Sequence, residues 1–496
     1  MAPQGRLKGG SPPPNDEGMK GPVGPDPGSP PRLATRNFED TRLSDPTHPE
    51  NPASTLAVPG GRGARLARLG WMATGIAGGM VAEGARQLAQ GNRPKLSDLL
   101  LTPANARRVA DQLAKLRGAA MKVGQLVSME SGDLLPPALA DILGRLRSDA
   151  RAMPKAQVKG VLDAQWGKGW EKRFTQFSYT PMAAASIGQV HRAQTKDGRD
   201  LAIKIQYPGV VESIDSDVDN VAALFRMSGL LPKEMDIKPL LRDAKRQLHD
   251  EADYLREAGY LSRYGELLAD APDYALPQLH ADLTTARVLA MSVVGGVPIE
   301  TLADAPQDER DRVMTLLFAL LLRELFEFRL VQTDPNFANY RFEPDTRQLI
   351  LLDFGATRPY KASMANEFRR LMKGAMAGDR EQMNTAALAI GYYDTSTQDR
   401  HRQTVLDMGE LALEPFRHNG PYDFGASDVL ARLRERGIEL GLDRDFWQLP
   451  PSDAMLLQRK FGGLYLLAIR LKARVNLHEL ALTGLVARKR GSPTPA

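Results

Sequence analysis

Two short motifs in the second half of the chain constrain its fold more than any other feature. Asp334 is followed by Asn339 five positions later, and Asp353-Phe354-Gly355 ends an apolar run at residues 349–352. One known arrangement for phosphoryl transfer uses an aspartate to orient the attacking group, and a later asparagine and aspartate to hold Mg²⁺ on the phosphates. Oxygen atoms are the ligands that Mg²⁺ prefers. The pattern predicts such a centre, with Asp334 in a catalytic role and Asn339 and Asp353 as metal ligands; two ordinary turns are the alternative.

The composition narrows the class of protein and its partners. At 496 residues the chain has room for two or three domains, and 42% hydrophobic residues are enough for a core. The 65 basic and 60 acidic residues give a net charge of +5, which fits an anionic ligand or membrane surface and is too small to indicate nucleic acid. Because there is no cysteine, disulfides, thiolate metal sites and cysteine nucleophiles are excluded.

The first 60 residues are rich in proline and glycine and poor in apolar side chains. Such a segment cannot bury enough surface to offset the entropy lost on ordering, so we expect a disordered tail at residues 1–60. The start of the chain lacks the basic and apolar pattern of a secretory signal. Its acidic Asp16 and Glu17 are unfavourable for an organellar transit peptide.

A helical extension is expected over residues 61–165, with a segment at 69–82 that can associate with a membrane. Residues 69–82 carry no charge, follow Arg62, Arg65 and Arg68, and contain small residues at helical spacing. The run is shorter than the roughly 20 apolar residues that cross a bilayer, so we expect it to lie at the membrane surface. A glycine-rich helix packed against the protein itself is the alternative, and the sequence does not decide between them.

Strand periodicity begins near residue 174 and frames a run of small residues. The stretch from Ala183 to Gly188 leads into a strand, Asp197-Gly198 predicts a hairpin turn, and the next strand contains Lys204. A kinase places its glycine-rich loop and its Val-Ala-Ile-Lys strand in this order. Backbone N–H groups of small residues can approach phosphates, and a lysine supplies positive charge to them. The predicted nucleotide-binding residues of this region are Ala183, Ala184, Ala185, Ser186, Gly188 and Lys204.

A buried lysine needs a carboxylate, and an acidic helix is predicted over residues 247–258. Asp253 and Glu257 share one face of that helix at i,i+4, whereas Glu251 points elsewhere. We therefore pair Glu257 with Lys204 and leave Glu251 and Asp253 for another role. The alternatives are a plain charged helix face and a lysine that points outward from an edge strand. Three alanines replace the glycines of a kinase loop, which removes backbone conformations with positive φ.

Together these motifs resemble the UbiB family of atypical protein-kinase-like proteins (AarF-domain type), and specifically its branch that supports coenzyme Q (ubiquinone) biosynthesis. The resemblance runs from about residue 96 to the end of the chain. One motif that carries the resemblance is Lys122-Val123-Gly124-Gln125. By itself this motif is a weak signal, and the alternative interpretation is a solvated lysine beside a packing glycine. The other motifs that carry the resemblance are Ala183-Ala184-Ala185-Ser186-Ile187-Gly188-Gln189-Val190-His191, Lys204-Ile205-Gln206-Tyr207-Pro208-Gly209-Val210, Glu251-Ala252-Asp253-Tyr254, Gln332-Thr333-Asp334-Pro335-Asn336, Leu352-Asp353-Phe354-Gly355-Ala356-Thr357-Arg358, Pro421-Tyr422-Asp423-Phe424-Gly425 and Lys460-Phe461-Gly462-Gly463.

The resemblance implies an α+β, two-lobed kinase-like fold with an added N-terminal helical extension. It implies that Lys122 and Gln125 of the extension cover the cleft and meet Glu251 and Asp253, a regulatory arrangement that suppresses protein phosphorylation. Mg²⁺-dependent binding of ATP or ADP and ATP hydrolysis then remain, and the alanine-rich loop tunes the choice of nucleotide. Two further observations agree with this. The chain has no Ala-Pro-Glu after the Asp-Phe-Gly turn, and Gln-Thr stands where a kinase has His-Arg.

We expect a small lobe at residues 166–294 and a helical large lobe at residues 295–496, with a core helix at residues 313–328. The backbone near Ser292 and Val294 would form the hinge that binds adenine. In the expected mechanism, Lys204 with Glu257 positions the phosphates, Asn339 and Asp353 hold Mg²⁺, and Asp334 orients the attacking water or hydroxyl.

The expected function is that of a Mg²⁺-dependent kinase-like ATPase that supports ubiquinone biosynthesis at a membrane without ordinary protein kinase activity. The alternatives are a small-molecule or lipid kinase acting on an isoprenoid precursor and a pseudokinase scaffold that binds nucleotide without turnover. The expected partners are an anionic membrane surface and quinone-biosynthesis proteins or lipid precursors, with no nucleic acid; a homodimer is left open. The expected location is the cytoplasmic face of a bacterial inner membrane, or the matrix side of the mitochondrial inner membrane in a eukaryote.

Overall fold

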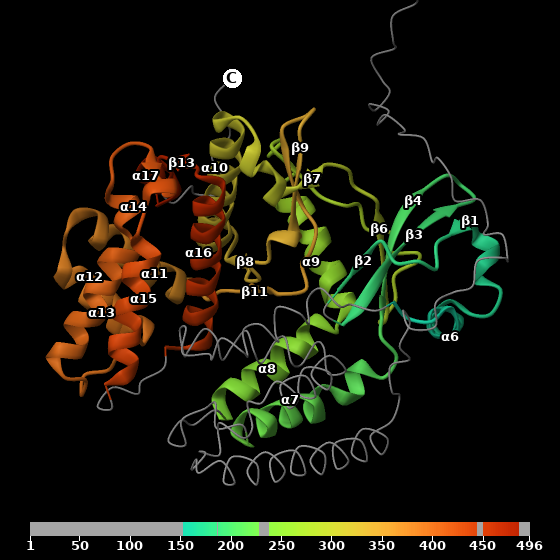
Figure 1. Ribbon diagram of the computed structural model, residues 1–496, viewed down its shortest axis with the longest axis horizontal. Helices are drawn as coiled ribbons and strands as arrows, with labels where there is room; N and C mark the ends of the chain where they lie inside the picture. The colour runs from blue at the N-terminus through green and yellow to red at the C-terminus, as the bar shows by residue number, and fades with distance from the viewer. Residues whose placement is uncertain (1–151, 186, 228–237, 444–449, 486–496) are drawn as a thin grey trace, which may run out of the picture. The chain divides into compact units, whose positions relative to one another are not determined.

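The computed structural model describes residues 152–185, 187–227, 238–443 and 450–485, which contain both sheet and helix (Figure 1). Along the chain a sheet-rich part comes first and a helical part follows. Several predicted features lie outside the described residues: the tail at residues 1–60, the segment at 69–82, Lys122, Gln125 and Ser186. Of the predicted extension at residues 61–165, the structure describes only the last part.

The sheet-rich part contains antiparallel strands in the order β1 (Phe174–Phe177), β3 (Gly188–Thr195), β4 (Asp200–Gln206) and β6 (Val288–Ser292), and β2 (Ala183–Ala184) pairs with β3. The predicted hairpin is present, and its Gly198 has a φ of 88°, a left-handed value that glycine adopts without steric cost. Lys204 on β4 lies opposite Val190 on one side and Leu289 on the other. The alternative of an edge-strand lysine is therefore wrong, because β4 is a central strand.

Helix α6 (Lys155–Trp166) supplies part of the hydrophobic core of this sheet. The side chains of β3 alternate between buried and half-buried positions, as expected for a strand with one covered face. The core includes Val158, Leu162, Trp170, Ile203, Ile205 and Val288. Because Val158 and Leu162 belong to α6, this core extends upstream of residue 166, where the small lobe was expected to begin.

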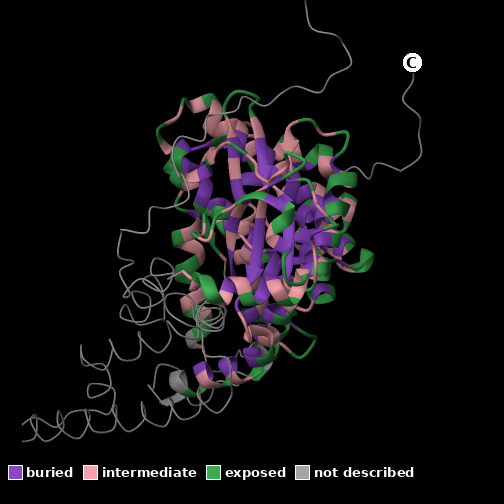
Figure 2. Cartoon of the chain, turned by 90° about the vertical axis from the view of Figure 1, so that its right-hand side faces the viewer, coloured by how far each residue is buried: buried purple, intermediate pink, exposed green. Residues whose placement is uncertain are grey.

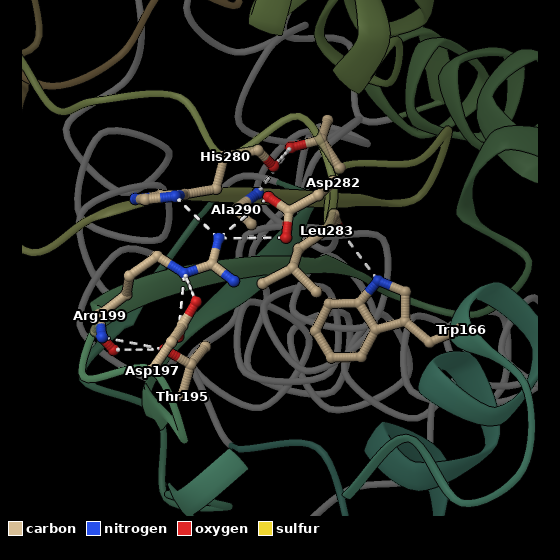
Figure 3. A network of polar contacts seen from close by, with 9 residues as sticks. Trp166, Thr195, Asp197, Arg199, His280, Asp282, Leu283 and Ala290 are labelled. Carbon is tan, nitrogen blue, oxygen red and sulfur yellow. Dashed lines mark hydrogen bonds and ion pairs between the residues drawn. The ribbon is translucent and has the colours of Figure 1, made fainter. Parts of the chain in front are cut away.

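The hairpin between β3 and β4 is tied to the loop before β6 by Arg199 (Figure 3). Its guanidinium lies 2.9 Å from Oδ2 of Asp197 and 3.0 Å from Oδ1 of Asp282. Beside it, Nε1 of Trp166 donates a hydrogen bond to the backbone oxygen of Leu283 at 2.9 Å. Exposed ion pairs contribute less than about 1 kcal/mol each. The ion pair with Asp282 therefore fixes the position of the hairpin more than it stabilises the fold.

Three helices, α7 (Val210–Met227), α8 (Lys238–Glu251) and α9 (Tyr254–Leu267), connect β4 to the rest of the sheet. The prediction of one helix over residues 247–258 is wrong, because α8 ends at Glu251 and α9 begins at Tyr254. Between them, the side chain of Asp253 accepts a hydrogen bond from the backbone N of Arg256 at 2.9 Å and caps α9. A short acidic side chain satisfies the first N–H groups of a helix and so favours a break at this point. Asp253 therefore does not share a helix face with Glu257.

The helical part is built around α10 (Gln307–Arg323), which continues as a π-helical turn at Glu324–Phe328. Its buried leucines confirm the core helix predicted at residues 313–328, although the helix begins earlier. Asp308 and Glu309 lie in the first turn of α10, where the helix dipole favours negative charge. Buried residues fill the interior, and exposed residues lie on the outer turns and loops (Figure 2).

Short strands of the helical part surround the two predicted catalytic motifs. One sheet has the order β5, β10, β9, β7, and a separate ladder pairs β8 with β11. Within the described stretches, no helix combines the length and the apolar character needed to cross a bilayer. The strands are β5 (Tyr274–Ala275), β7 (Val297–Pro298), β8 (Leu330–Gln332), β9 (Tyr340–Glu343), β10 (Gln348–Leu351), β11 (Thr357–Pro359), β12 (Tyr422–Asp423) and β13 (Arg474–Val475), and the later helices are α11 (Ala362–Ala377), α12 (Arg380–Ile390), α13 (Asp399–Ala412), α14 (Glu414–Arg417), α15 (Val429–Leu442), α16 (Ser452–Leu471) and α17 (Leu477–Leu485).

His191 on β3 is predicted to make the stability of the protein depend on pH. Its ring is buried, and burial lowers the pKa of the imidazole, with the hydrogen bond between Nδ1 and the backbone oxygen of Ser178 opposing the shift. Because the folded-state pKa is lowered, the unfolded chain binds the proton more tightly. The free energy of unfolding is therefore fully retained above about pH 6.5 and falls below it, by at most about 1.4 kcal/mol per pH unit.

Urea denaturation at about pH 7.5 and about pH 5 measures this loss. The variant His191→Gln should lose less stability on acidification than the wild type. Equal losses in the two proteins would show that His191 is not the titrating group.

Candidate active site

The lysine of β4 lies between two carboxylates from distant parts of the chain. Nζ of Lys204 is 2.8 and 2.9 Å from the two carboxylate oxygens of Glu257 on α9, and 3.1 Å from Oδ2 of Asp353. The side chains of Lys204 and Glu257 are 8% and 2% exposed, whereas that of Asp353 is 35% exposed. The ion pair predicted between Lys204 and Glu257 is confirmed. Asp353 is the member of this group that a ligand can reach.

Burial and charge oppose each other in this group. Burial acts to lower the pKa of Lys204, but the negative charges of Asp353 and Glu257 outweigh it and hold the pKa well above its ordinary value. Burial raises the pKa of the Glu257 carboxyl, and the positive charge of Lys204 acts against that shift. The ring of Tyr254, 5.2 Å from Nζ, adds a favourable cation–π contact. Lys204 is therefore a fixed positive charge within reach of Asp353.

The turn that carries Asp353 is held by its neighbours on both sides. Oδ1 of Asp353 accepts a hydrogen bond from the backbone N of Gly355 at 2.9 Å. Phe354 is buried, and its ring centre lies 4.8 Å from that of Tyr264 on α9. A Cβ atom at Gly355 would lie 3.3 Å from Oδ1 of Asp353 and 3.4 Å from Oε2 of Glu257. Glycine therefore lets the turn approach α9 without pressing on either carboxylate.

The predicted catalytic loop lies directly beside this turn. The backbone N of Leu352 donates to the backbone oxygen of Asn339 at 3.0 Å, and the backbone N of Thr333 donates to that of Ala356 at 3.2 Å. One bond lies at each end of the loop. The structure thus brings Asn339 next to the residue that precedes Asp353, as the spacing of the two motifs predicts.

The polar groups of the loop and the turn fit a Mg²⁺ ion bound together with phosphates. Nδ2 of Asn339 lies 3.3 Å from Oδ2 of Asp334, which leaves the carbonyl oxygen of Asn339 as the atom able to bind a metal. In the part of the chain that the structure describes, no three His, Asp or Glu side chains gather as a metal site. Mg²⁺ commonly takes one or two protein side chains and completes its shell with phosphate oxygens and water. Asp353 and Asn339 meet that requirement.

The segment that follows the Asp-Phe-Gly turn is short and is held against α9. Nη1 of Arg256 on α9 donates to the backbone oxygen of Gly355 at 3.1 Å, and Nη2 donates to that of Thr357 at 2.7 Å. Strand β11 begins at Thr357 and α11 at Ala362, so no long segment separates the turn from the next helix. This agrees with the absence of Ala-Pro-Glu from the sequence. The role of Arg256 was not predicted, because one arginine in a charged helix carries no distinguishing pattern.

The alanine-rich stretch differs from an open glycine-rich loop. Ala183 and Ala184 pair with β3 as strand β2, and the backbone N of Ala185 donates to the backbone oxygen of Gly188 at 2.9 Å. This N–H closes a tight turn and is not directed to a ligand. A Cβ atom at Gly188 would overlap the backbone oxygen of Ile205. Gly188 is therefore needed for the packing of β3 on β4, independently of any nucleotide.

The predicted hinge residues have different surroundings. The backbone N of Ser292 donates to the backbone oxygen of Gln278 at 2.9 Å, and its hydroxyl oxygen accepts from the N of Gln278 at 2.8 Å. The backbone N of Val293 donates to the oxygen of Asp200 at 3.0 Å. Ser292 thus holds the strand edge, which leaves Val294 as the better candidate to contact adenine.

The predicted regulatory residues are only partly described. Asp253 is exposed and caps α9, and Glu251 is half-buried at the end of α8. Both lie close in sequence to Glu257, the partner of Lys204. Their predicted contact with Lys122 and Gln125 stays a prediction, because those two residues lie outside the described part of the chain.

Helix α16 also contacts the catalytic loop, a contact that was not predicted from the sequence. Nζ of Lys460 lies 3.0 Å from Oε1 of Gln332 and also bonds to the hydroxyl of Tyr340. Nη2 of Arg459 lies 3.1 Å from Oδ1 of Asp334. One signal was available: Lys460 interrupts an apolar helical stripe, and a charge in such a position is costly unless it is paired.

These features define a class of protein. An antiparallel sheet with a buried lysine–glutamate pair is followed by a helical part that carries a catalytic-loop aspartate and asparagine and an Asp-Phe-Gly turn. This is the two-lobed, protein-kinase-like fold. Among solved structures, the chain is similar to Rv3197 from Mycobacterium tuberculosis, solved in complex with erythromycin. The TM-score is 0.54 at 25% identity, and the match covers 76% of this chain and 95% of that one.

Comparison of sequences narrows the class. Residues 145–387 match the ABC1 atypical kinase-like domain. The chain is 36% identical over 453 residues to "Atypical kinase COQ8B, mitochondrial" of Rattus norvegicus, covering 90% of this chain and 85% of the relative. It is also 36% identical over 441 residues to "Atypical kinase COQ8, mitochondrial" of Saccharomyces cerevisiae, covering 87% of each. The chain therefore belongs to the ABC1 (UbiB) family of atypical kinases, which confirms the predicted family and fold class.

Removing the positive charge of Lys204 is predicted to lower the stability of the protein strongly. Lys204→Met leaves Glu257 and Asp353 facing each other without a cation, and it should reduce the free energy of unfolding by about 3–5 kcal/mol. Urea denaturation measures the change. Lys196→Met, an exposed lysine on the same hairpin, is the matched control and should change stability by less than about 0.5 kcal/mol.

The double variant Lys204→Met/Glu257→Leu separates charge from packing. Replacing both members of a buried ion pair by apolar residues of similar size is often close to neutral. The double variant should therefore regain most of the stability lost in Lys204→Met. A double variant no more stable than the single one would show that uncompensated charge is not the cause of the loss.

Proposed function

We propose that this protein binds ATP with Mg²⁺ and hydrolyses it, in support of coenzyme Q biosynthesis at a membrane. The observation that carries the proposal is the pairing of Lys204 with both Glu257 and Asp353, directly beside the loop that holds Asp334 and Asn339. Membership of the ABC1 family supports the nucleotide chemistry. The link to coenzyme Q rests on the resemblance to that branch of the family.

Each side chain of the proposed centre has a distinct task. Lys204, oriented by Glu257, would bind the α- and β-phosphates, and Asp353 and Asn339 would hold Mg²⁺. The bound ion would neutralise charge on the phosphates. Asp334 would orient the attacking water. The small-residue stretch around Ala183, Ala184, Ala185, Ser186 and Gly188 would border the phosphates, and the hinge at Ser292 and Val294 would border adenine.

The closed segment after the turn favours water over a protein hydroxyl as the acceptor. A protein kinase presents its peptide substrate on the long segment that follows Asp-Phe-Gly. Here Arg256 binds the backbone at Gly355 and Thr357, and β11 begins at once. This leaves no equivalent platform in the described residues. We further propose that Lys122 and Gln125 cover the same region by contacting Glu251 and Asp253.

Phosphate release from Mg²⁺-ATP by the purified protein tests the proposal. Asp353→Asn removes a negative charge that would hold the metal, and it should lower turnover at least about 100-fold. Chelating Mg²⁺ with EDTA should abolish turnover. Asp345→Asn, an exposed aspartate in the turn between β9 and β10, is the matched control and should keep wild-type turnover. Nucleotide binding without turnover would favour a pseudokinase scaffold, and labelled product from lipid extract would favour a lipid kinase.

Association with a membrane is tested separately. The mild positive charge and the arginines ahead of residues 69–82 support binding to anionic lipid. Sedimentation with liposomes should carry the protein into the pellet when they contain anionic lipid, and less so with neutral lipid or at high salt. Protein that stays in the supernatant with anionic liposomes at physiological salt would rule out this part of the proposal.

A further inference from the structure

Helix α16 presents one face to the catalytic loop, and the proposed hydrolysis assigns no role to it. Arg459, Lys460 and Gly463 lie within about 100° of arc on this helix, because each residue advances by about 100°. All three contact residues between Gln332 and Tyr340. The contact is long-range, since 125 positions separate Arg459 from Asp334.

Gly463 sets how closely the helix can approach the loop. A Cβ atom built at Gly463 would overlap Cβ of Pro335, the residue that follows Asp334. Pro335 is rigid and contributes no N–H group to the loop. The helix backbone therefore rests directly on the residue after the predicted catalytic aspartate, and α16 occupies a single position relative to the loop.

Lys460 holds both ends of the loop from its buried side. It is 2% exposed, and its Nζ bonds to Oε1 of Gln332 and to the hydroxyl of Tyr340. Burial acts to lower the pKa of Lys460, but interactions with Tyr340 and Glu324 outweigh it and raise the pKa. The lysine thus remains a cation. Because Gln332 precedes the loop and Tyr340 follows it, one side chain fixes the two ends.

Arg459 acts on the centre of the loop. Its Nη2 is 3.1 Å from Oδ1 of Asp334, while Nδ2 of Asn339 lies 3.3 Å from Oδ2. Each oxygen of the carboxylate therefore has a donor of its own, and rotation of the group is restricted. The side chain of Arg459 is only 10% exposed, so solvent weakens this ion pair less than it weakens an exposed one. Residues 330–340 contain no lysine or arginine, so the loop itself supplies no cation.

We propose that Arg459 is a positioning residue that fixes the carboxylate of Asp334 in the orientation needed to align the attacking water. The inference deepens the proposed hydrolysis and rests on it. A misplacement of about 1 Å in a catalytic group can reduce the rate about 100-fold. A guanidinium on one carboxylate oxygen and an amide on the other prevent such a misplacement without touching the nucleotide.

Steady-state kinetics of phosphate release test this role. Arg459→Gln should lower kcat about 10- to 100-fold and leave KM for ATP and the melting temperature close to wild type. Arg459→Lys keeps the charge but not the planar fork, so it should recover part of the loss. Arg470→Gln is the matched control. Arg470 lies on the same helix and pairs with Glu300 at 2.6 Å, and its loss should leave kcat unchanged.

Because Arg459 acts through Asp334, the two residues should be coupled. In single-turnover reactions of the Asp334→Asn protein, adding Arg459→Gln should cause no further loss of rate. Losses that multiply would show that Arg459 acts independently of Asp334, and would overturn the inference.

Hydrogen exchange separates failure of this inference from failure of the proposed function. If the wild type releases no phosphate, the hydrolysis proposal fails, yet Arg459→Gln should still speed amide exchange in the peptide covering residues 330–341. Arg470→Gln should not. The inference would be overturned if amide exchange is unchanged in Arg459→Gln and its kcat equals that of the wild type. It would also be overturned if amide exchange is unchanged and neither protein releases phosphate.

Discussion

The buried charge of Lys204 is the constraint on which the rest of the site depends. An ammonium group taken out of water is stable only when anions surround it. Its anions come from two different elements, Glu257 on α9 and Asp353 on the turn after β10. The sheet-rich part, α9 and the helical part must therefore come together before the charge is compensated. The candidate active site is therefore complete only when these three parts of the fold are together.

The same requirement explains why the segment after the turn is short and tightly held. Asp353 can compensate Lys204 only if the turn stays against α9. Arg256, one residue before Glu257 on that helix, binds the backbone on the far side of Gly355. Many protein kinases assemble the lysine–glutamate pair only after a long segment is rearranged. Here the helix that supplies the glutamate also fixes the segment, so the pair is complete without such a rearrangement.

Sequence reasoning succeeded where chemistry and local spacing coincide. The β3–β4 hairpin followed from Asp197-Gly198, and the pairing of Glu257 with Lys204 followed from the cost of an unpaired buried lysine. It failed where one side chain changes the local backbone. Asp253 caps α9 and so breaks the single helix that was predicted over residues 247–258. The backbone N–H of Ala185 donates to the backbone oxygen of Gly188 in a turn. In both cases a local hydrogen bond was energetically preferable to the regular pattern.

The contacts of α16 show a different limit, because no local pattern encodes them. The loop that carries Asp334 is weakly held by its own residues: its regular structure is a single 3-10 turn at Phe337–Asn339, capped by Asn336. Such a loop needs rigid neighbours to keep a catalytic side chain in place. The β9–β10 ladder fixes the Asn339 end, and α16 fixes Gln332, Asp334 and Pro335. Since Lys460 is buried and must remain paired, sliding of α16 along the loop is costly. The distance between Asp334 and Asp353 is thus set by two supports that meet at Tyr340: the ladder beside the loop, and a helix more than a hundred residues away.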